Sequence, residues 1–462
     1  MAIHSPKGGG LTAQLKQKLI QQALERKLKR AGADEVMQPA ARASGGAASV
    51  AAGSPAVPDG APIPEAFYRF DMMPAYQQLQ IMSKGAEHLG IPSPYFKVHE
   101  GISGDEARIG DRDYINYASY DYLGMSRDPV VMSAAKDAID RYGTSVSASR
   151  ILAGERPIHQ ELEQAMAQVY DCEDAVTFVS GHATNVSTIG QLFGPRDLVL
   201  HDELVHNSVV VGIQLSGAHR VPFAHNDWQA VDELLGRQRR QFERVLIVLE
   251  GLYGMDGDIP DLPRFVEVKN RHKAFLMVDE AHSFGVLGER GYGLREHFGM
   301  RGSDVDIWMG TFSKAMAGCG GYIAGEKAMV EHLRYLAPGF LYSVGMAPSL
   351  TAGSLAALRC MQAEPQRVAQ LQARGQYFLR EAQAAGLDTG TSIGMSVIPV
   401  IVGASVAAAK LSAALFEEGI NAMPILYPAV PEKSARLRFF MSCLHTTEQI
   451  DATVGALRRL VG

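Results

Sequence analysis

The sequence predicts an α/β protein with a large domain built on a mostly parallel sheet and a smaller C-terminal α+β domain. From about residue 112, short β-rich runs alternate with helical patterns, an order typical of a parallel sheet wrapped by helices. Several runs are apolar throughout, as are strands that are buried on both faces. From about residue 346 a long helical stretch precedes two further β-rich runs. We therefore expect a large domain over 112–345 and a small domain over 346–462.

The composition is that of a soluble globular protein of two or three domains. The chain has 462 residues, of which 47% are hydrophobic and 20% are charged. Its net charge of −6 does not favour nucleic acid as a partner, and no apolar run is long enough to cross a membrane. The four cysteines form neither a disulfide framework nor a paired metal motif. We therefore expect a cytoplasmic protein without a bound metal.

The N-terminus differs in charge from the rest of the chain. Residues 1–33 contain seven Lys or Arg and one Glu, and leucines recur every four residues from Leu11, which predicts one basic amphipathic helix. Such a helix could pack on a dimer partner, dock on an acidic carrier protein or lie on an anionic membrane surface. Residues 34–64 are rich in Ala, Gly, Ser and Pro and predict a flexible linker, and residues 65–111 then form an N-terminal arm.

The elements of the folded body follow from hydrophobic periodicity. Candidate strands of the large domain lie at 174–179, 197–200, 245–250, 274–279, 305–309 and 321–324. Helical patterns lie between them, for example at 159–170 and 261–272. The strands expected in the small domain are 396–402 and 436–442. In open sheets of this kind ligands bind beyond the carboxyl ends of the strands, so residues that follow these runs are candidates for a site.

Three of those residues have the side chains that pyridoxal phosphate (PLP) needs. Lys314 ends the motif Gly310-Thr-Phe-Ser-Lys314 after one strand, and Asp279 and His282 follow the strand 274–279. A buried lysine can form a Schiff base, a buried carboxylate can keep the pyridine nitrogen protonated, and a histidine can hold the phenolic oxygen. A lysine with a lowered pKa could act first as nucleophile and then as acid and base. Together the three residues predict a PLP enzyme.

Two further segments allow more than one interpretation. The turn Ser180-Gly-His182 follows the first strand, and a helix starting at Ala183 would point its N–H groups at a phosphate. The same turn could also be an ordinary strand-to-helix connection. His206 comes just after another strand, where it could stack on the cofactor ring and bind a substrate carboxylate. Alternatively, His206 could only cap the helix that follows it.

From about Tyr114 to Ile450 the chain resembles the α-oxoamine synthases, a family of fold-type I PLP-dependent transferases. The motifs that carry the resemblance occur in order at 116–124, 149–154 with His159, 180–185, 206–208, 250–257, 278–282, 310–314 and 436–438. No single motif identifies the family, since Asp279 and Lys314 alone would fit any fold-type I enzyme. The whole ordered set identifies it.

The resemblance implies the decarboxylative condensation of a small amino acid with an acyl thioester. The products would be an α-amino ketone, carbon dioxide and a free thiol, as in lipid or secondary-metabolite biosynthesis. The thioester would be an acyl-CoA or an acyl carrier protein, and the active site would lie across a homodimer interface. The segments Ser119-Tyr-Asp121 and Thr311-Phe-Ser313 look more like the serine palmitoyltransferase branch, so serine is the favoured amino acid, with glycine or alanine possible.

The resemblance also implies a role for each matching residue. Lys314 looks like the Schiff-base lysine, Asp279 like the partner of the pyridinium nitrogen, and His282 like the donor to the phenolic oxygen. His206 is similar to the histidine that stacks on the ring. The other implied contacts are the backbone of Gly181 and His182 to the phosphate, Thr311 to the cofactor, Ser343 to the phosphate in the second subunit, and Arg438 and Ser119 to the substrate. Gly254, in the cofactor site, stands where the family often has serine.

Two other functions compete with this one. Another fold-type I lyase or aminotransferase would share Asp279 and Lys314 but would not release a free thiol. A non-catalytic partner subunit could have the same fold, but it should have lost its lysine. Lys314 is present with its neighbours intact, so the sequence favours an enzyme.

Overall fold

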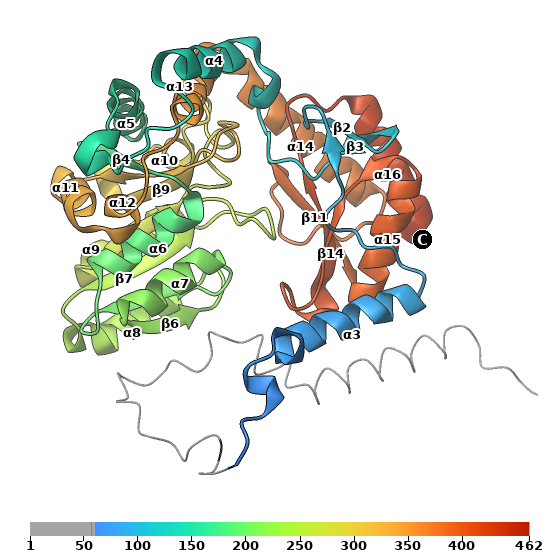
Figure 1. Ribbon diagram of the computed structural model, residues 1–462, viewed down its shortest axis with the longest axis horizontal. Coiled ribbons are helices and arrows are strands. Elements are labelled where there is room, and N and C mark those ends of the chain that lie inside the picture. The colour runs from blue at the N-terminus through green and yellow to red at the C-terminus, as the bar shows by residue number, and fades with distance from the viewer. Residues whose placement is uncertain (1–56, 58–60, 462) are drawn as a thin grey trace, which may run out of the picture. The chain divides into compact units, whose positions relative to one another are not determined.

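The computed structural model describes Val57 and residues 61–461 (Figure 1). The helix predicted over 1–33 and almost all of the linker predicted over 34–64 lie outside these residues. The chain divides into one unit that ends at Phe96 and a second that begins at Lys97. The described helices of the first unit are η1 (Glu65–Phe67), η2 (Phe70–Met72) and α3 (Pro74–His88). Proline suits the first position of α3, because its missing N–H costs no helical hydrogen bond there.

A seven-stranded, mostly parallel sheet forms the centre of the second unit. Its strands, in spatial order, are β4 (Asp174–Phe178), β10 (Gly321–Gly325), β9 (Ile307–Thr311), β8 (Phe275–Asp279), β7 (Val245–Glu250), β5 (Leu198–Asp202) and β6 (His219–Phe223). Within this sheet β10 alone runs antiparallel to its neighbours. The predicted fold class and the six predicted strands are confirmed. The sequence does not predict β6, because this edge strand carries His219, Arg220 and Pro222 in place of an apolar run.

Both faces of this sheet are buried, which explains why its strands are apolar throughout. Along β7, Val245, Ile247 and Leu249 pack into one hydrophobic cluster, whereas Leu246 and Val248 pack into another. The first cluster includes side chains of α5 (Pro157–Tyr170) and α9 (Leu262–His272), and the second includes side chains of α6 (Gly181–Leu192), α7 (Asn207–Ser216) and α11 (Lys327–Leu336). Figure 1 shows these helices around the sheet. The other helices before residue 346 are α4 (Pro129–Tyr142), α8 (Trp228–Gln238), α10 (Leu294–Phe298), α12 (Pro338–Leu341), η3 (Met125–Arg127), η4 (Arg150–Gly154), η5 (Arg239–Gln241) and η6 (Gly302–Asp304).

The C-terminal part combines small sheets with helices, as the sequence predicts. Its helices are α13 (Pro348–Ala363), α14 (Gln366–Ala384), α15 (Ser405–Glu417), α16 (Thr447–Val461) and the short η7 (Glu432–Ser434). One sheet is antiparallel, with the order β11 (Val397–Gly403), β14 (Ala435–Phe440), β13 (Met423–Ile425). The other has the order β1 (His99–Glu100), β2 (Glu106–Ile109), β3 (Arg112–Asn116), β12 (Ile420–Asn421). Because β12 pairs with β3, the beginning of the second unit is joined to its C-terminal part.

Membrane-spanning helices, metal-binding clusters and disulfides are absent from the described residues. Among them, no helix is both long enough and apolar enough to span a membrane. The same part of the chain holds no group of three or more His, Cys, Asp or Glu side chains arranged to bind a metal ion. The cysteines Cys172, Cys319, Cys360 and Cys443 are free.

Asp202, His225 and Asp258 form a charged cluster that connects the end of β5 with the loop that follows β7. His225, in the loop after β6, has Nδ1 3.1 Å from Asp202 and Nε2 2.9 Å from Asp258. The hydroxyl of Thr391, in the C-terminal part, donates to the same Asp258 carboxylate at 2.9 Å. Burial by itself lowers the pKa of His225, but its two carboxylate partners outweigh burial and raise the pKa to about 10. His225 is therefore a cation at neutral pH.

We expect His225→Gln to lower the free energy of unfolding by about 3 kcal/mol at mildly acidic pH, because the change leaves two acids without their cation. The pKa of His225 is about 10 in the folded protein and about 6.5 in an unfolded chain. The stabilisation by the charged His225 is therefore complete below about pH 6.5, and it is lost as the pH rises through about 10. Thermal unfolding of the variant and the wild type at both ends of this range measures the effect. His219→Gln, at an exposed histidine of β6, is the control. A loss of stability that does not shrink with rising pH would contradict the role of the cation.

Candidate active site

The carboxyl ends of four adjacent strands bring the predicted residues together. β9, β8, β7 and β5 are neighbours and run in the same direction, so the residues that follow them meet at one edge of the sheet. Asp279 ends β8, Glu250 ends β7, Lys314 follows β9 and His206 follows β5. Electrostatic interactions link Lys314 with both Asp279 and Glu250, and link His206 with Asp279 and Lys314. Residues that are far apart in the sequence therefore form one cluster.

The carboxylate of Asp279 is buried and fixed by hydrogen bonds on both oxygens. Its Oδ2 accepts from Asn185 Nδ2 at 2.8 Å, and its Oδ1 accepts from the backbone N–H of Ala281 at 3.0 Å. Asn185 also donates to Ser208 Oγ at 2.9 Å. Only 4% of Asp279 is exposed. The sequence analysis gave Asn185 no role of its own, although it lies in the motif 180–185.

The amine of Lys314 has a lowered pKa. Burial is the main cause that lowers the pKa of Lys314, and the nearby cation of Arg438 adds to it. The acids Asp279 and Glu250 act in the opposite direction. The Lys314 Nζ lies 5.7 Å from the centre of the ring of Tyr120, which is partly exposed. A neutral amine can act as a nucleophile and can accept a proton.

His282 is oriented by Tyr122. Its Nδ1 lies 2.8 Å from the Tyr122 hydroxyl. Burial lowers the pKa of His282 well below its usual value, and the nearby basic groups of Lys314 and Arg438 lower it further, so the ring is neutral. A neutral ring that accepts from Tyr122 at Nδ1 carries its proton at Nε2, where it can donate. The sequence analysis did not identify Tyr122, because nothing in the motif 116–124 shows which tyrosine points at His282.

His206 caps a helix and is itself exposed. It precedes α7, its Nδ1 accepts from the backbone N–H of Ser208 at 3.3 Å, and its Nδ1 lies 2.7 Å from Ser208 Oγ. The residue is exposed on one side, and the partial burial of its ring lowers its pKa. The exposed His182 lies edge-on to it, with the ring centres 6.4 Å apart. Both interpretations of His206 are therefore compatible with its geometry.

The turn after β4 opens the N-terminus of α6. The helix begins at Gly181 and not at Ala183, because the Ser180 hydroxyl caps it by accepting from the Ala183 N–H at 3.3 Å. A Cβ atom at Gly181 would lie 2.8 Å from Thr311 Oγ1, so only glycine allows this close approach. Thr311 Oγ1 donates to the carbonyl of Gly320 at 2.8 Å. The first N–H groups of α6 thus face the edge where Lys314 lies.

Arg438 reaches the cluster from β14 of the C-terminal part. Its Nη1 donates to the carbonyl of Gly254 at 2.8 Å, and its guanidinium lies 4.5 Å from the centre of the Phe440 ring. Burial lowers its pKa. Its buried Nε has no hydrogen-bond partner among the described residues. A Cβ atom at Gly254 would lie 2.6 Å from His282 Nε2, so a serine there would force the imidazole to move.

Two predicted residues, Ser119 and Ser343, make no hydrogen bond to these groups within the described part of the chain. Ser119 is half-buried beside Tyr120, and its hydroxyl accepts from the Asp121 N–H at 3.2 Å. Ser343 lies between α12 and α13, and in the described part of the chain it makes no hydrogen bond to any residue of the cluster. Its neighbour Tyr342 is 87% exposed.

Glu250 is the buried acid that the sequence analysis overlooked. It is 6% exposed and ends β7, at the start of the motif 250–257. Burial is the main cause that raises its pKa to about 8, and the neighbouring Asp279 raises it further. The signal was present in the sequence, because an acid closes a strand that is otherwise apolar along its whole length.

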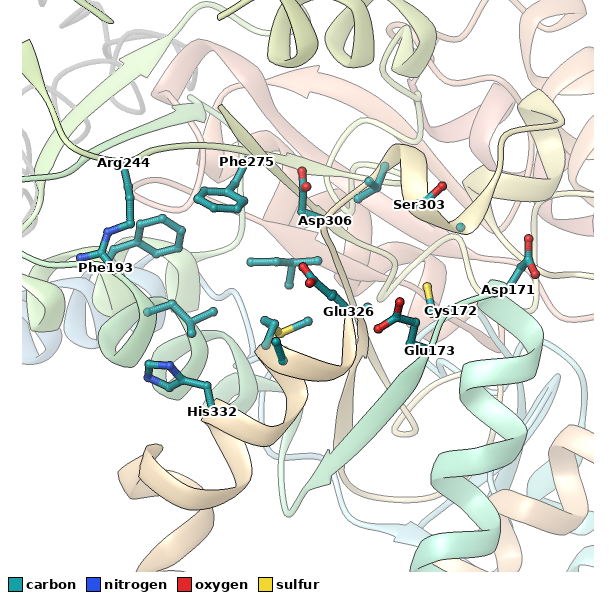
Figure 2. Close-up of a pocket in the computed structure, with 17 residues that line it drawn as sticks. Asp171, Cys172, Glu173, Phe193, Arg244, Phe275, Ser303, Asp306, Glu326 and His332 are labelled. Atoms are coloured by element: carbon teal, nitrogen blue, oxygen red, sulfur yellow. The ribbon is translucent and has the colours of Figure 1, made fainter. Parts of the chain in front are cut away.

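A cavity at the opposite edge of the large sheet does not belong to this site. It has a volume of about 520 Å³ and is lined by residues at the beginning of β8 and β9, among them Phe275 and Ile307. Figure 2 shows Phe275 and Asp306 beside it. Asp279 and Lys314 follow the other ends of the same two strands, so the sheet separates the cavity from the cluster.

The sequence and the fold both match known proteins. Residues 112–457 match the family described as Aminotransferase class I and II. The 8-amino-7-oxononanoate synthase of Thermoanaerobacter pseudethanolicus is 34% identical over 390 residues, which cover 84% of this chain and 98% of that protein. The serine palmitoyltransferase of Sphingobacterium spiritivorum is 34% identical over 366 residues, which cover 79% and 91% of the two chains. A solved structure of a serine palmitoyltransferase variant from S. paucimobilis, with a bound PLP–myriocin aldimine, has a TM-score of 0.81 at 30% identity and covers 84% of this chain and 98% of its own.

The chain therefore belongs to the aminotransferase class I and II family. Within that family it is an α-oxoamine synthase, a PLP-dependent acyltransferase, as the sequence analysis predicted.

The cluster fits PLP. Asp279 offers a fixed carboxylate, and Gly181 leaves the N-terminus of α6 free for a phosphate. The buried Oδ1 of Asn185 and the buried Nε of Arg438 have no protein partner within the described residues. Unpaired buried polar atoms are costly, so a ligand that bonds them would stabilise the site.

Proposed function

We propose that this enzyme condenses a small amino acid with an acyl thioester and releases an α-amino ketone, carbon dioxide and a free thiol. Serine is the preferred amino acid, with glycine or alanine as alternatives. The observation that carries the proposal is the position of a mostly buried Lys314 near the fixed Asp279 and within electrostatic reach of Arg438. The similarity to serine palmitoyltransferases in sequence and in fold supports it, as do the segments Ser119-Tyr-Asp121 and Thr311-Phe-Ser313.

When bound, PLP supplies an electron sink that stabilises negative charge at Cα of the amino acid. Lys314 would be the point of attachment, and its Nζ would accept the proton from Cα and later return it. Its lowered pKa serves this role, because only the neutral amine can accept a proton. Loss of that proton lets Cα attack the thioester carbonyl, and the thiol then leaves. Carbon dioxide is lost from the resulting β-keto acid.

The other residues of the cluster would stabilise charges on the cofactor and orient the amino acid. Asp279 would keep a proton on the pyridine nitrogen, and His282 would donate from Nε2 to the phenolic oxygen. His206 would lie against the ring face and could bond the carboxylate of the amino acid. Arg438, through its unpaired Nε, would bind the same carboxylate, with Ser119 close to the substrate. Each group would be fixed before the reaction begins, which is where electrostatic stabilisation is largest.

The phosphate would be held by contributions from two copies of the chain. We propose that the backbone N–H groups of Gly181 and His182 and the side chain of Thr311 bind it in one copy. Ser343 of a second copy would complete this site, which makes the enzyme a homodimer. The exposed side chains of Tyr342 and Val344, on either side of Ser343, support an interface at this segment.

A product screen tests the proposed function. Purified enzyme with PLP is given serine, alanine or glycine together with an acyl-CoA or an acyl carrier protein, and the products are analysed by mass spectrometry. We expect the fastest release of carbon dioxide and thiol with serine. An oxo acid formed without a free thiol would indicate an aminotransferase. The role of the basic segment 1–33 is tested by removing it. Rates with the two acyl donors, before and after removal, show whether the segment binds an acidic carrier protein. Binding to anionic vesicles, before and after removal, shows whether it binds a membrane.

A further inference from the structure

We propose that Glu250 is a positioning residue that holds His206 and Arg438 at a fixed spacing, so that both meet the substrate carboxylate at once. This inference rests on the proposed function, because it concerns how the amino acid is bound. It assigns a role to a residue that does not itself touch the reacting atoms.

The two carboxylate oxygens of Glu250 accept hydrogen bonds from two different segments of the site. Oε1 accepts from the backbone N–H of His206 at 2.6 Å, and Oε2 accepts from the backbone N–H of Gly254 at 3.2 Å. His206 is the last residue of the connection from β5 to α7, whereas Gly254 lies in the loop that follows β7. One carboxylate therefore joins two segments that share no helix or strand.

The connection continues from Gly254 to Arg438. The carbonyl of Gly254 accepts from Arg438 Nη1 at 2.8 Å, so hydrogen bonds hold this residue on both of its backbone groups. Glycine has no Cβ and is otherwise the freest residue in the chain, and here the nearby His282 ring excludes any side chain. The position of Arg438 thus depends on a flexible residue that Glu250 fixes.

Among the residues that the structure describes, the two amides that Glu250 holds have no alternative acceptor. Within the described residues, Glu250 is the only hydrogen-bond acceptor for the N–H of His206 and for the N–H of Gly254. An unpaired N–H at either position would have to turn toward solvent or toward the ligand. Loss of the carboxylate therefore changes the site directly and does not merely remove packing.

The groups around Glu250 act on its charge in opposite directions. Asp279, at the end of the neighbouring β8, repels the carboxylate, and Lys314, after β9, attracts it. Burial and Asp279 raise the pKa of Glu250 to about 8. The hydrogen bonds from the N–H groups of Gly254 and His206 act against this rise, because they favour the ionised form, which accepts with both oxygens. The side chain of glutamine keeps one acceptor and puts a donor in place of the other.

The test uses Glu250→Gln in two measurements, with Glu280→Gln as the matched control. Glu280 is also a buried acid, with its pKa raised to about 7 by burial, but it binds Ser283 and the N–H of Leu294. In the protein without PLP, we expect amide hydrogen exchange at His206 and Gly254 to be at least about tenfold faster in Glu250→Gln and unchanged in the control. With PLP, the KM for serine should rise about tenfold, whereas the KM for the acyl thioester should stay the same.

Wild-type exchange rates at both amides, or an equal rise in both KM values, would overturn the role of Glu250. If Glu250→Gln does not fold, Glu250→Asp gives a second measurement. It keeps the charge but is one methylene shorter, so it cannot reach both amides and one of them should exchange faster. Protection of both amides in Glu250→Asp would also contradict the role. Failure of the proposed function itself would show separately, as a wild-type enzyme that releases no thiol, while the exchange measurement would still report on Glu250.

Discussion

Lys314→Ala will lower the rate of thiol release by at least about 10³-fold, since it removes both the attachment point and the proton acceptor at Cα. Lys314 is mostly buried, and its pKa is lowered mainly by burial, as a nucleophilic and proton-accepting amine requires. The expected result is measured as the initial rate of thiol release with serine and an acyl thioester. Borohydride reduction of the wild type followed by peptide mapping should place the cofactor on residue 314 and nowhere else.

The chain offers a matched control for this change. Lys269 is also buried, but it is paired with Asp306 at 2.7 Å, at the edge of the sheet where the strands begin. Lys269→Ala should lower the melting temperature and leave the borohydride adduct on Lys314. Turnover near the wild-type level in Lys314→Ala, or an adduct on another lysine, would contradict the assignment of the active site.

The second large effect is expected for Asp279→Asn, which should lower turnover by about 10²–10⁴-fold. A neutral amide cannot hold a proton on the pyridine nitrogen, so the electron sink is weakened. The new NH2 group would also face Asn185 Nδ2, which donates to Asp279 at 2.8 Å in the wild type, or would have to turn away from it. Steady-state kinetics with serine, together with thermal unfolding of the variant, separate lost chemistry from lost stability.

Asp306→Asn is the control for this prediction. Asp306 is another acid of the same sheet, but it binds Lys269 and the N–H of Leu276 on the side away from Lys314. This variant should unfold at a lower temperature and keep most of its turnover. If Asp279→Asn kept turnover within a few-fold of the wild type, another group would have to hold the charge of the pyridine nitrogen.

Much of the fold could be predicted because a parallel sheet buried on both faces leaves a clear pattern. β7 was predicted with the bounds observed, since all its residues are buried and all but the last are apolar. The edge strand β6 could not be predicted, because only one of its five residues is buried and its composition resembles a loop. The start of α6 was misplaced by two residues, because the capping role of Ser180 depends on a hydrogen bond that the sequence does not show.

The order of residues along the chain was enough to predict the chemistry. Lys314, Asp279 and His282 come after apolar strands, and strands that run in one direction bring the residues at their carboxyl ends to one edge of the sheet. The groups that hold these residues in place became visible only in the folded protein. Asn185, Tyr122 and Glu250 act through hydrogen bonds across 94, 160 and 44 positions of the chain. Local sequence patterns indicate whether a residue is buried. The hydrogen-bond partner of a buried polar group depends on how distant segments pack together, and a local pattern carries no information about that packing.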